Sequence, residues 1–143
     1  MTVGKLTHAD RSVCADVAKL LKQLRDDPKE HNVSLADAER IVRDKNVVLI
    51  VAKDKGHIVG MGTLYMITKF GKRTGHVEDV VVDGSYRGRG LGKKIMRVII
   101  AAAKKGKLSS VSLTSRPERE AANRLYQKVG FEHKETNVYR LKL

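Results

Sequence analysis

Three glycines at alternate positions, Gly88, Gly90 and Gly92, constrain the fold of this 143-residue chain more than any other feature. They follow a β-branched apolar run at residues 76–82 and precede a segment whose apolar residues repeat at helical spacing. Glycine lets the backbone approach a ligand closely, and the N–H groups of such a turn, together with the N-terminus of the next helix, attract anions. The sequence therefore predicts a strand–turn–helix unit that binds phosphate.

Two common phosphate-binding motifs do not fit this turn. A P-loop needs a glycine five residues before Gly92 and a serine or threonine after the lysine, but the chain has Arg87 and Lys94 there. A dinucleotide fingerprint needs G-x-G-x-x-G in the first strand–helix unit, whereas the glycines here are spaced G-x-G-x-G and helices precede the first strand. Neither motif accounts for the turn.

The other patterns predict a single domain over residues 1–143, with no repeat and no linker. Apolar spacing and capping signals predict helices at residues 13–24, 34–42, 91–105 and 115–129. Short β-rich runs predict strands at residues 46–52, 58–67, 76–82, 108–114, 131–133 and 138–143. Strict alternation along residues 76–82 would put His76, Glu78 and Val80 on one face of their strand.

Net charge narrows the class of partner. The chain carries 29 Lys and Arg against 16 Asp and Glu, a net charge of +13, and residues 71–143 hold 10 of these charges. Such an excess indicates nucleic acid, an acidic surface or a phosphorylated small molecule. With no membrane span, no signal peptide and Cys14 as its single cysteine, the chain is expected to be cytoplasmic, without membrane, disulfide framework or metal site.

Two motifs resemble the GNAT superfamily of N-acetyltransferases. Arg87, Gly90 and Gly92 fit that family's pyrophosphate loop, Q/R-x-x-G-x-G/A, and residues 123–131 (NRLYQKVGF) are similar to its late helix-to-strand segment. Together the motifs cover residues 76–133. The resemblance implies an α/β (α+β) fold in which helices flank a mixed, mostly antiparallel sheet, with a parallel pair of strands splayed at the cofactor-binding strand.

The resemblance also implies how acetyl-CoA binds. The backbone of Val80, Val81 and Val82 would hold the acetyl and pantetheine end. The N–H groups of the turn would bind the pyrophosphate: Arg87, Gly88, Arg89, Gly90, Leu91 and Gly92. Many relatives carry an asparagine seven residues before the motif tyrosine, where this chain has Arg119, so Asn123, one turn later, is the candidate for that contact.

Tyr126 matches the tyrosine that relatives often use as general acid, and a phenol can protonate a thiolate leaving group when the geometry is fixed. Glu78 and His76 stand where relatives carry bases that deprotonate the acceptor amine. No cysteine lies on this strand, so direct transfer is favoured over an acyl-enzyme. Arg116, Arg119 and Arg124 are spread around the last helix and are expected to face solvent.

The acceptor stays open at this point. Residues 75–82 (GHVEDVVV) are similar to the corresponding strand of glucosamine-6-phosphate N-acetyltransferases, and nearby Lys69, Lys72 and Arg73 would attract an acidic substrate. A protein or polyamine amine is the alternative, and a homodimer is left open. The rival class is a non-enzymatic nucleic-acid-binding module, but two Phe, four Tyr and no Trp argue against a base-stacking surface.

Overall fold

The computed structural model describes residues 1–143. It contains five strands, four α-helices and two short 3-10 helices: β1 (Thr2–Lys5), α1 (Arg11–Leu24), η1 (Pro28–Glu30), α2 (Leu35–Arg43), β2 (Val47–Asp54), β3 (His57–Lys69), β4 (Lys72–Val82), η2 (Gly84–Tyr86), α3 (Leu91–Lys105), β5 (Val111–Ser112) and α4 (Glu120–Lys128). The strands form one sheet in the order β1-β2-β3-β4-β5, antiparallel except for the parallel β4–β5 pair. The predicted mixed, mostly antiparallel α/β fold is confirmed.

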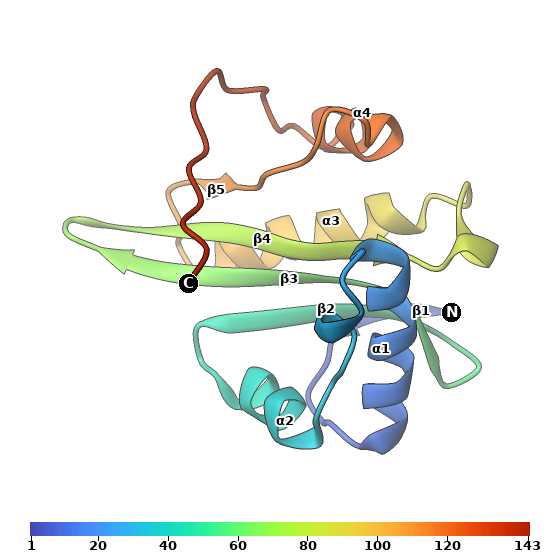
Figure 1. Cartoon of the computed structure of the whole chain (residues 1–143). Helices are drawn as coiled ribbons and strands as arrows, with labels where there is room; N and C mark the ends of the chain where they lie inside the picture. The colour runs from blue at the N-terminus through green and yellow to red at the C-terminus, as the bar shows by residue number, and fades with distance from the viewer.

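Helices cover both faces of this sheet (Figure 1). One face packs against α1, which buries Val13, Leu20 and Leu21, and α2 closes the end of that layer. The other face packs against α3 and α4, where Ile95 and Ile99 are fully buried. Because each fully buried aliphatic side chain stabilises the fold by about 1.5–3 kcal/mol, these two cores fix the sheet between its helical layers.

Local sequence signals set where the first two helices begin. The Asp10 carboxylate accepts a hydrogen bond from the Val13 N–H at 2.8 Å, which caps α1. The Ser34 hydroxyl accepts from the Asp37 N–H at 3.1 Å and caps α2, as the sequence predicts. Side-chain oxygens at these positions satisfy N–H groups that a helix leaves unpaired in its first turn.

Glycines in β3 bring α3 close to the sheet. A Cβ atom at Gly62 would lie 2.8 Å from the Cδ1 atom of Ile99, and one at Gly60 would lie 3.0 Å from the Cδ1 atom of Ile95. Any side chain at these two positions would push α3 outward. This close approach sets the N-terminus of α3 at the end of β4, where the glycine-rich turn lies.

A β-bulge interrupts β4 at Asp79, whose φ of 54° lies in the left-handed region. Glu78 pairs with Thr63 and Val81 pairs with Met61, so two residues of β4 oppose one residue of β3. The bulge resets the alternation of side chains, and Val80 packs in the core on the α3 side. The prediction that Val80 shares a face with His76 and Glu78 was therefore wrong, because strict alternation does not allow for the extra residue.

The C-terminal part of the chain differs most from the sequence prediction. Residues 131–143 form no strand, and after the Phe131 N–H donates to the Tyr126 carbonyl they make no backbone–backbone hydrogen bond. Four apolar side chains there are largely exposed: Val138, Tyr139, Leu141 and Leu143. In Figure 1 the segment loops away from α4 and then runs down past β5, β4 and β3 in this view, but it is drawn as coil to its end. An alternating pattern predicts extended backbone, but a strand also needs an adjacent edge to pair with.

The bounds of β5 and α4 also differ from the predicted ones, and the sequence patterns did not predict β1. Strand β5 has only two paired residues. Helix α4 begins at Glu120 instead of residue 115, because the Arg119 N–H donates to the Arg116 carbonyl in a separate turn around Pro117. No helix combines the length and apolar character needed to cross a bilayer. No group of three or more His, Cys, Asp or Glu side chains is arranged to hold a metal ion.

Candidate functional site

The parallel strands β4 and β5 pair briefly and then diverge. Only Gly75 with Val111 and His76 with Ser112 are in register. Beyond these pairs lies a cavity of about 410 Å³, whose walls are the next residues of both strands, the end of α1, the start of α4 and part of the C-terminal segment. The predicted splayed pair is confirmed, and the cavity occupies the gap that the splay opens.

The glycine-rich turn lies at the end of β4 and presents unpaired N–H groups. Gly88 and Gly90 have φ values of 75° and 73°, a left-handed conformation that favours glycine. Backbone N–H groups from Gly88 to Lys93 donate to no backbone carbonyl, and no side chain caps the N-terminus of α3. Six consecutive free donors at a helix N-terminus fit the pyrophosphate of a CoA-type donor.

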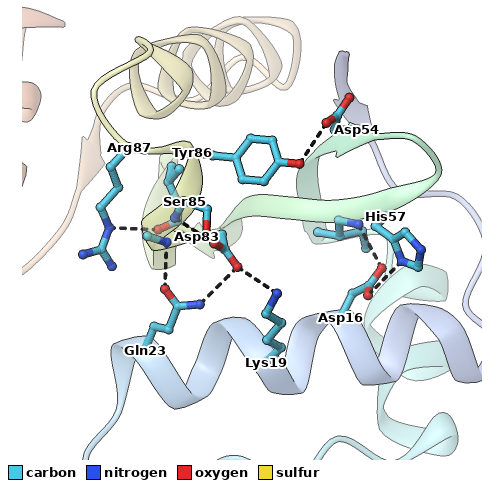
Figure 2. A network of polar contacts seen from close by, with 12 residues as sticks. Asp16, Lys19, Gln23, Asp54, His57, Asp83, Ser85, Tyr86 and Arg87 are labelled. Atoms are coloured by element: carbon cyan, nitrogen blue, oxygen red, sulfur yellow. Dashed lines mark hydrogen bonds and ion pairs between the residues drawn. The ribbon is translucent and has the colours of Figure 1, made fainter.

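A polar network holds the base of this turn (Figure 2). The buried Asp83 carboxylate accepts from the Ser85 N–H at 2.9 Å and from the Gln23 amide at 3.3 Å, and it pairs with Lys19 at 3.2 Å. The backbone hydrogen bond from Ser85 is the main cause that lowers the pKa of Asp83 to about 2, with Lys19 and Gln23 adding to it. Asp83 is therefore ionised throughout the neutral range.

Aromatic and arginine side chains add to the support of the turn. The Tyr86 hydroxyl donates to the Asp54 carboxylate at 2.8 Å, and the guanidinium of Arg89 lies 5.1 Å from the centre of the Tyr86 ring. Arg87 turns back toward β4 and donates from Nε to the Val82 carbonyl at 3.1 Å (Figure 2). The side chains of this turn thus brace it, while its N–H groups face outward.

His76 and Glu78 lie together on the α1 side of β4. The Nε2 atom of His76 is 2.8 Å from the Oε1 atom of Glu78. Glu78 lines the cavity beside Asp79. The pair can accept a proton from an amine that enters the cavity and share it between carboxylate and imidazole.

Asp79 and Tyr65 belong to the same region, and neither was among the predicted site residues. The carboxylate of Asp79 lies 2.7 Å from the guanidinium of Arg25, which follows the last residue of α1. Burial raises the pKa of Tyr65, and the negative charges of Asp79 and Glu78 raise it further. The carboxylates of Asp79 and Glu78 thus lie near one positive charge, the guanidinium of Arg25, and near the protonated phenol of Tyr65.

Tyr126 enters the cavity from α4 and is 6% exposed. Its ring meets the Phe131 ring edge-on, with centroids 6.1 Å apart. Burial raises the pKa of Tyr126, and the nearby positive charge of Arg119 lowers it in part. The phenol therefore keeps its proton at neutral pH, as a general acid must before it acts.

Asn123 has a local role in the structure. Its amide donates to the Arg116 carbonyl at 3.1 Å and to the Pro117 carbonyl at 3.5 Å, within the turn that precedes α4. It does not line the cavity. Contact between Asn123 and the pantetheine stays a prediction.

Charged residues of opposite sign line the cavity, and most of them escaped the sequence prediction. The acidic ones are Asp26, Asp27, Glu30, Glu78 and Asp79. The basic ones are Arg25, Arg116, Arg119 and Arg140. Arg116 is exposed, as expected, but Arg119 is partly buried, and both border the cavity instead of facing bulk solvent alone. No local motif marks these arginines, because the end of α1, the turn before α4 and the C-terminal segment meet only in the folded chain.

This fold, with an anion-binding turn at a splayed parallel pair and a tyrosine in the gap, defines a class of enzymes that bind a phosphorylated donor. Residues 15–131 match the acetyltransferase (GNAT) family. A probable glucosamine 6-phosphate N-acetyltransferase 2 from Oryza sativa subsp. japonica is 40% identical over 94 residues, which cover 61% of this chain and 55% of the rice protein. This chain thus spans about half the length of that relative.

Two trypanosomal proteins are similar over more of the chain. A glucosamine 6-phosphate N-acetyltransferase of Trypanosoma brucei brucei is 36% identical over 118 residues, 79% of this chain and 78% of the relative. The crystal structure of a Trypanosoma brucei acetyltransferase superposes with a TM-score of 0.79 at 31% identity, covering 99% of both chains. The chain belongs to the GNAT family of acetyltransferases, which use acetyl-CoA as acetyl donor.

Proposed function

We propose that this protein transfers the acetyl group of acetyl-CoA directly to the primary amine of a phosphorylated amino sugar, with glucosamine 6-phosphate as the first acceptor to test. One observation carries the proposal: the cavity at the splayed strands is lined by five carboxylates, a phenol and four arginines, and two of these arginines, Arg119 and Arg140, have no ion-pair partner. An amino sugar phosphate carries a cationic amine, which suits the carboxylates, and an anionic phosphate, which suits the arginines. Relatives named for this activity, 36% and 40% identical, support the same acceptor.

Acetyl-CoA supplies an activated acetyl group, and this chain's residues orient it. The free N–H groups of residues 88–93 would bind the pyrophosphate. The bulge at Asp79 shifts β4 out of regular register with β3, and the backbone of Val80, Val81 and Val82 then runs along the splay toward the turn. These features support an extended pantetheine arm along β4 whose acetyl end reaches the cavity.

Glu78 and His76 would remove the proton from the acceptor ammonium. An amine attacks only in its neutral form, so a base at the entrance of the cavity raises the rate. The 2.8 Å contact between the two side chains supports a role for Glu78 as the acceptor of the proton, with His76 orienting the carboxylate. The sequence offered Glu78 and His76 as equivalent candidates for the base, and this assignment makes Glu78 the base.

Tyr126 would donate its proton to the departing CoA thiolate. Its hydroxyl group belongs to a ring held by Phe131 and the α3-side core, so its position is fixed before substrates bind. Arg119 would stabilise the tyrosinate that remains after the proton has moved, because a positive charge favours the ionised phenol.

The acceptor phosphate would bind on the basic side of the cavity. Arg116 is exposed and Arg119 partly so, and guanidinium groups bind phosphate in a bidentate manner. Arg116 has one weak partner, Asp26 at 3.7 Å, which a phosphate would displace readily.

A panel of amines, assayed for release of free CoA at fixed acetyl-CoA, tests this proposal. We expect kcat/KM for glucosamine 6-phosphate to exceed that for glucosamine by about 100-fold, the value of a charge-assisted bidentate contact. A higher kcat/KM for spermidine or for a peptide N-terminus would overturn the amino sugar assignment and leave acetyl transfer standing.

Acetyl transfer itself has a separate test. Saturating CoA should stabilise the protein by about 2.7 kcal/mol at 100 times its Kd, measured by thermal unfolding. No stabilisation by CoA, together with tight, salt-sensitive binding of RNA or DNA, would favour the nucleic-acid-binding alternative.

A homodimer in the cytoplasm completes the proposal. The exposed apolar side chains of Val138, Leu141 and Leu143 support association, because such residues are usually covered. Light scattering after gel filtration would give twice the 15.9 kDa chain mass for a dimer, and the chain mass itself would contradict it.

A further inference from the structure

The turn that would bind pyrophosphate cannot hold its own position. Its six free N–H groups from Gly88 to Lys93 are unavailable for internal hydrogen bonds if they serve a ligand. From Gly84 onward the backbone bonds of the turn are short-range, from Tyr86 to Asp83, from Arg87 to Gly84 and from Lys94 to Gly90, and the nearest long-range one joins the Asp83 N–H to the Val59 carbonyl at 2.9 Å. Its placement relative to β4 must therefore come from other elements.

Helix α1 contributes to that placement through one side-chain amide, beside the contacts of Tyr86 with Asp54 and of Arg87 with Val82. The Gln23 Oε1 atom accepts from the Gly84 N–H at 2.9 Å, while its Nε2 group donates to the Asp83 carboxylate at 3.3 Å. Figure 2 shows Gln23 pointing from α1 to the start of the turn. A single amide thus fixes both a carboxylate and the next peptide group, across 60 and 61 residues of sequence.

The neighbouring cation contributes less to this contact. Lys19 pairs with Asp83 at 3.2 Å, but its side chain is 72% exposed, and exposed ion pairs are weak. A Cβ atom at Gly84 would be in ordinary van der Waals contact with the Gln23 Oε1 atom, 3.6 Å away, so the amide lies directly beside the start of the turn.

We infer that Gln23 is a positioning residue for donor binding: with Asp83 it forms a latch by which α1 sets the height and angle of the anion-binding turn. This inference rests on the proposed acetyl-CoA site. It extends the site to a residue that touches neither substrate and lies outside both sequence motifs.

Gln23→Glu is the sharpest variant, because it keeps the size of the side chain and the acceptor for the Gly84 N–H. It replaces the donor with a second carboxylate that faces Asp83. We expect the Kd for CoA, measured by calorimetry, and the KM for acetyl-CoA to rise about tenfold, as for loss of a charge-assisted hydrogen bond. The kcat at saturating donor and the KM for the acceptor should stay within about twofold, because the acceptor side is untouched.

A double variant tests whether the chemistry of the latch matters or only its packing. Gln23→Glu combined with Asp83→Asn restores one amide and one carboxylate with their positions exchanged. We expect the Kd for CoA to return to within about threefold of the parent value. Failure of this rescue, with a folded double variant, would overturn the latch.

Asp16 offers a matched control at the other end of α1. It accepts from the Ile58 N–H at 2.9 Å and lies 3.3 Å from His57, so it ties α1 to the start of β3 and makes no contact with the glycine-rich turn itself. Figure 2 shows both anchors on the same helix. Asp16→Asn should lower the melting temperature without changing the Kd for CoA. An equal change in Kd for Asp16→Asn and Gln23→Glu would show a general effect of α1 and overturn the inference.

Amide hydrogen exchange in the unliganded chain separates this inference from the proposed function. Gln23→Glu should speed exchange of the hydrogen-bonded amides of residues 84–87 relative to Asp16→Asn, whether or not CoA binds. If Gln23→Glu does not fold, Gln23→Ala replaces it in each measurement. Unchanged hydrogen exchange in a folded Gln23 variant would overturn the positioning role of Gln23. Absence of CoA binding to the parent protein would instead overturn the proposed donor site.

Discussion

The donor side and the acceptor side of the cavity are built differently. On the donor side, backbone N–H groups face outward, and Asp83, Gln23 and Tyr86 brace the turn from behind. On the acceptor side, arginine side chains border the cavity, and the sole ion pair of Arg116 is a 3.7 Å contact with the exposed Asp26. Arg140 comes from a segment without backbone pairing.

This difference separates what is preorganised from what is adaptable. A site made of backbone groups depends little on side-chain identity, so it suits a donor that a whole family shares. A site made of exposed long side chains can change with single substitutions, and it suits an acceptor that differs between relatives. Perturbing each side should therefore affect different kinetic constants.

Tyr126→Phe should give the largest effect, because it removes the proton donor and keeps the ring in the core. We expect kcat to fall about 1000-fold, within the range for general acid catalysis. Steady-state kinetics measure the loss, and calorimetry should find the Kd for CoA unchanged. Because burial raises the pKa of Tyr126 above its ordinary value of 10.0, the phenol of the parent enzyme should stay protonated up to pH 10.0, and activity should not fall for loss of this proton. Full activity in Tyr126→Phe would remove it from the mechanism.

Glu78→Gln should follow, with kcat about 100-fold lower from loss of the base. The matched variant is His76→Gln, which should cost less, since His76 reaches the acceptor through Glu78 in the proposed arrangement. Activity assays on both variants rank the two bases. A larger loss in His76→Gln would reverse their roles.

Arg119→Met tests the acceptor side. We expect the KM for glucosamine 6-phosphate to rise about tenfold, while the KM for acetyl-CoA stays constant. Arg124→Met is the control, because Arg124 pairs with Glu120 at 3.9 Å on α4 and does not line the cavity. A parallel rise in the KM for acetyl-CoA would mean that the two sides are not separate.

Asp83→Asn should give the smallest effect on kcat; it should lower the stability of the fold and, through its contact with Gln23, weaken CoA binding. The pKa of Asp83 is lowered to about 2 in the folded protein, from an ordinary 3.8, so its charge stabilises the fold above pH 4 and that stability is lost as the pH falls toward 2. Allowing for screening by water, we expect a loss of about 1 kcal/mol at pH 7, measured by urea unfolding. The parent and variant should converge near pH 2; an equal difference at both pH values would contradict the cause.

Local sequence carried the donor side of the site. Gly88, Gly90 and Gly92 lie in one short turn between a strand and a helix, and backbone conformation at such positions follows from the absence of a side chain. Tyr126 and the strand with Glu78 and His76 were also recognisable, because each belongs to a continuous motif. The fold class followed from the order of these elements.

The bulge, the latch and the C-terminal segment could not be read from the sequence. Residues 76–82 contain no signal that predicts the left-handed conformation of Asp79, since that conformation results from the register of β4 against β3. An alternating pattern at residues 138–143 predicted a strand, but these residues make no backbone hydrogen bond to the sheet. Contacts between residues far apart in the chain set all three features.

By itself, then, the sequence determined the anion-binding turn, the tyrosine and the family, because short-range backbone geometry and continuous motifs encode them. Only the tertiary structure decided which charges border the cavity and what holds the turn. Arg25, Arg116 and Arg140 become neighbours of one cavity through folding alone, and Gln23 meets Asp83 across 60 residues.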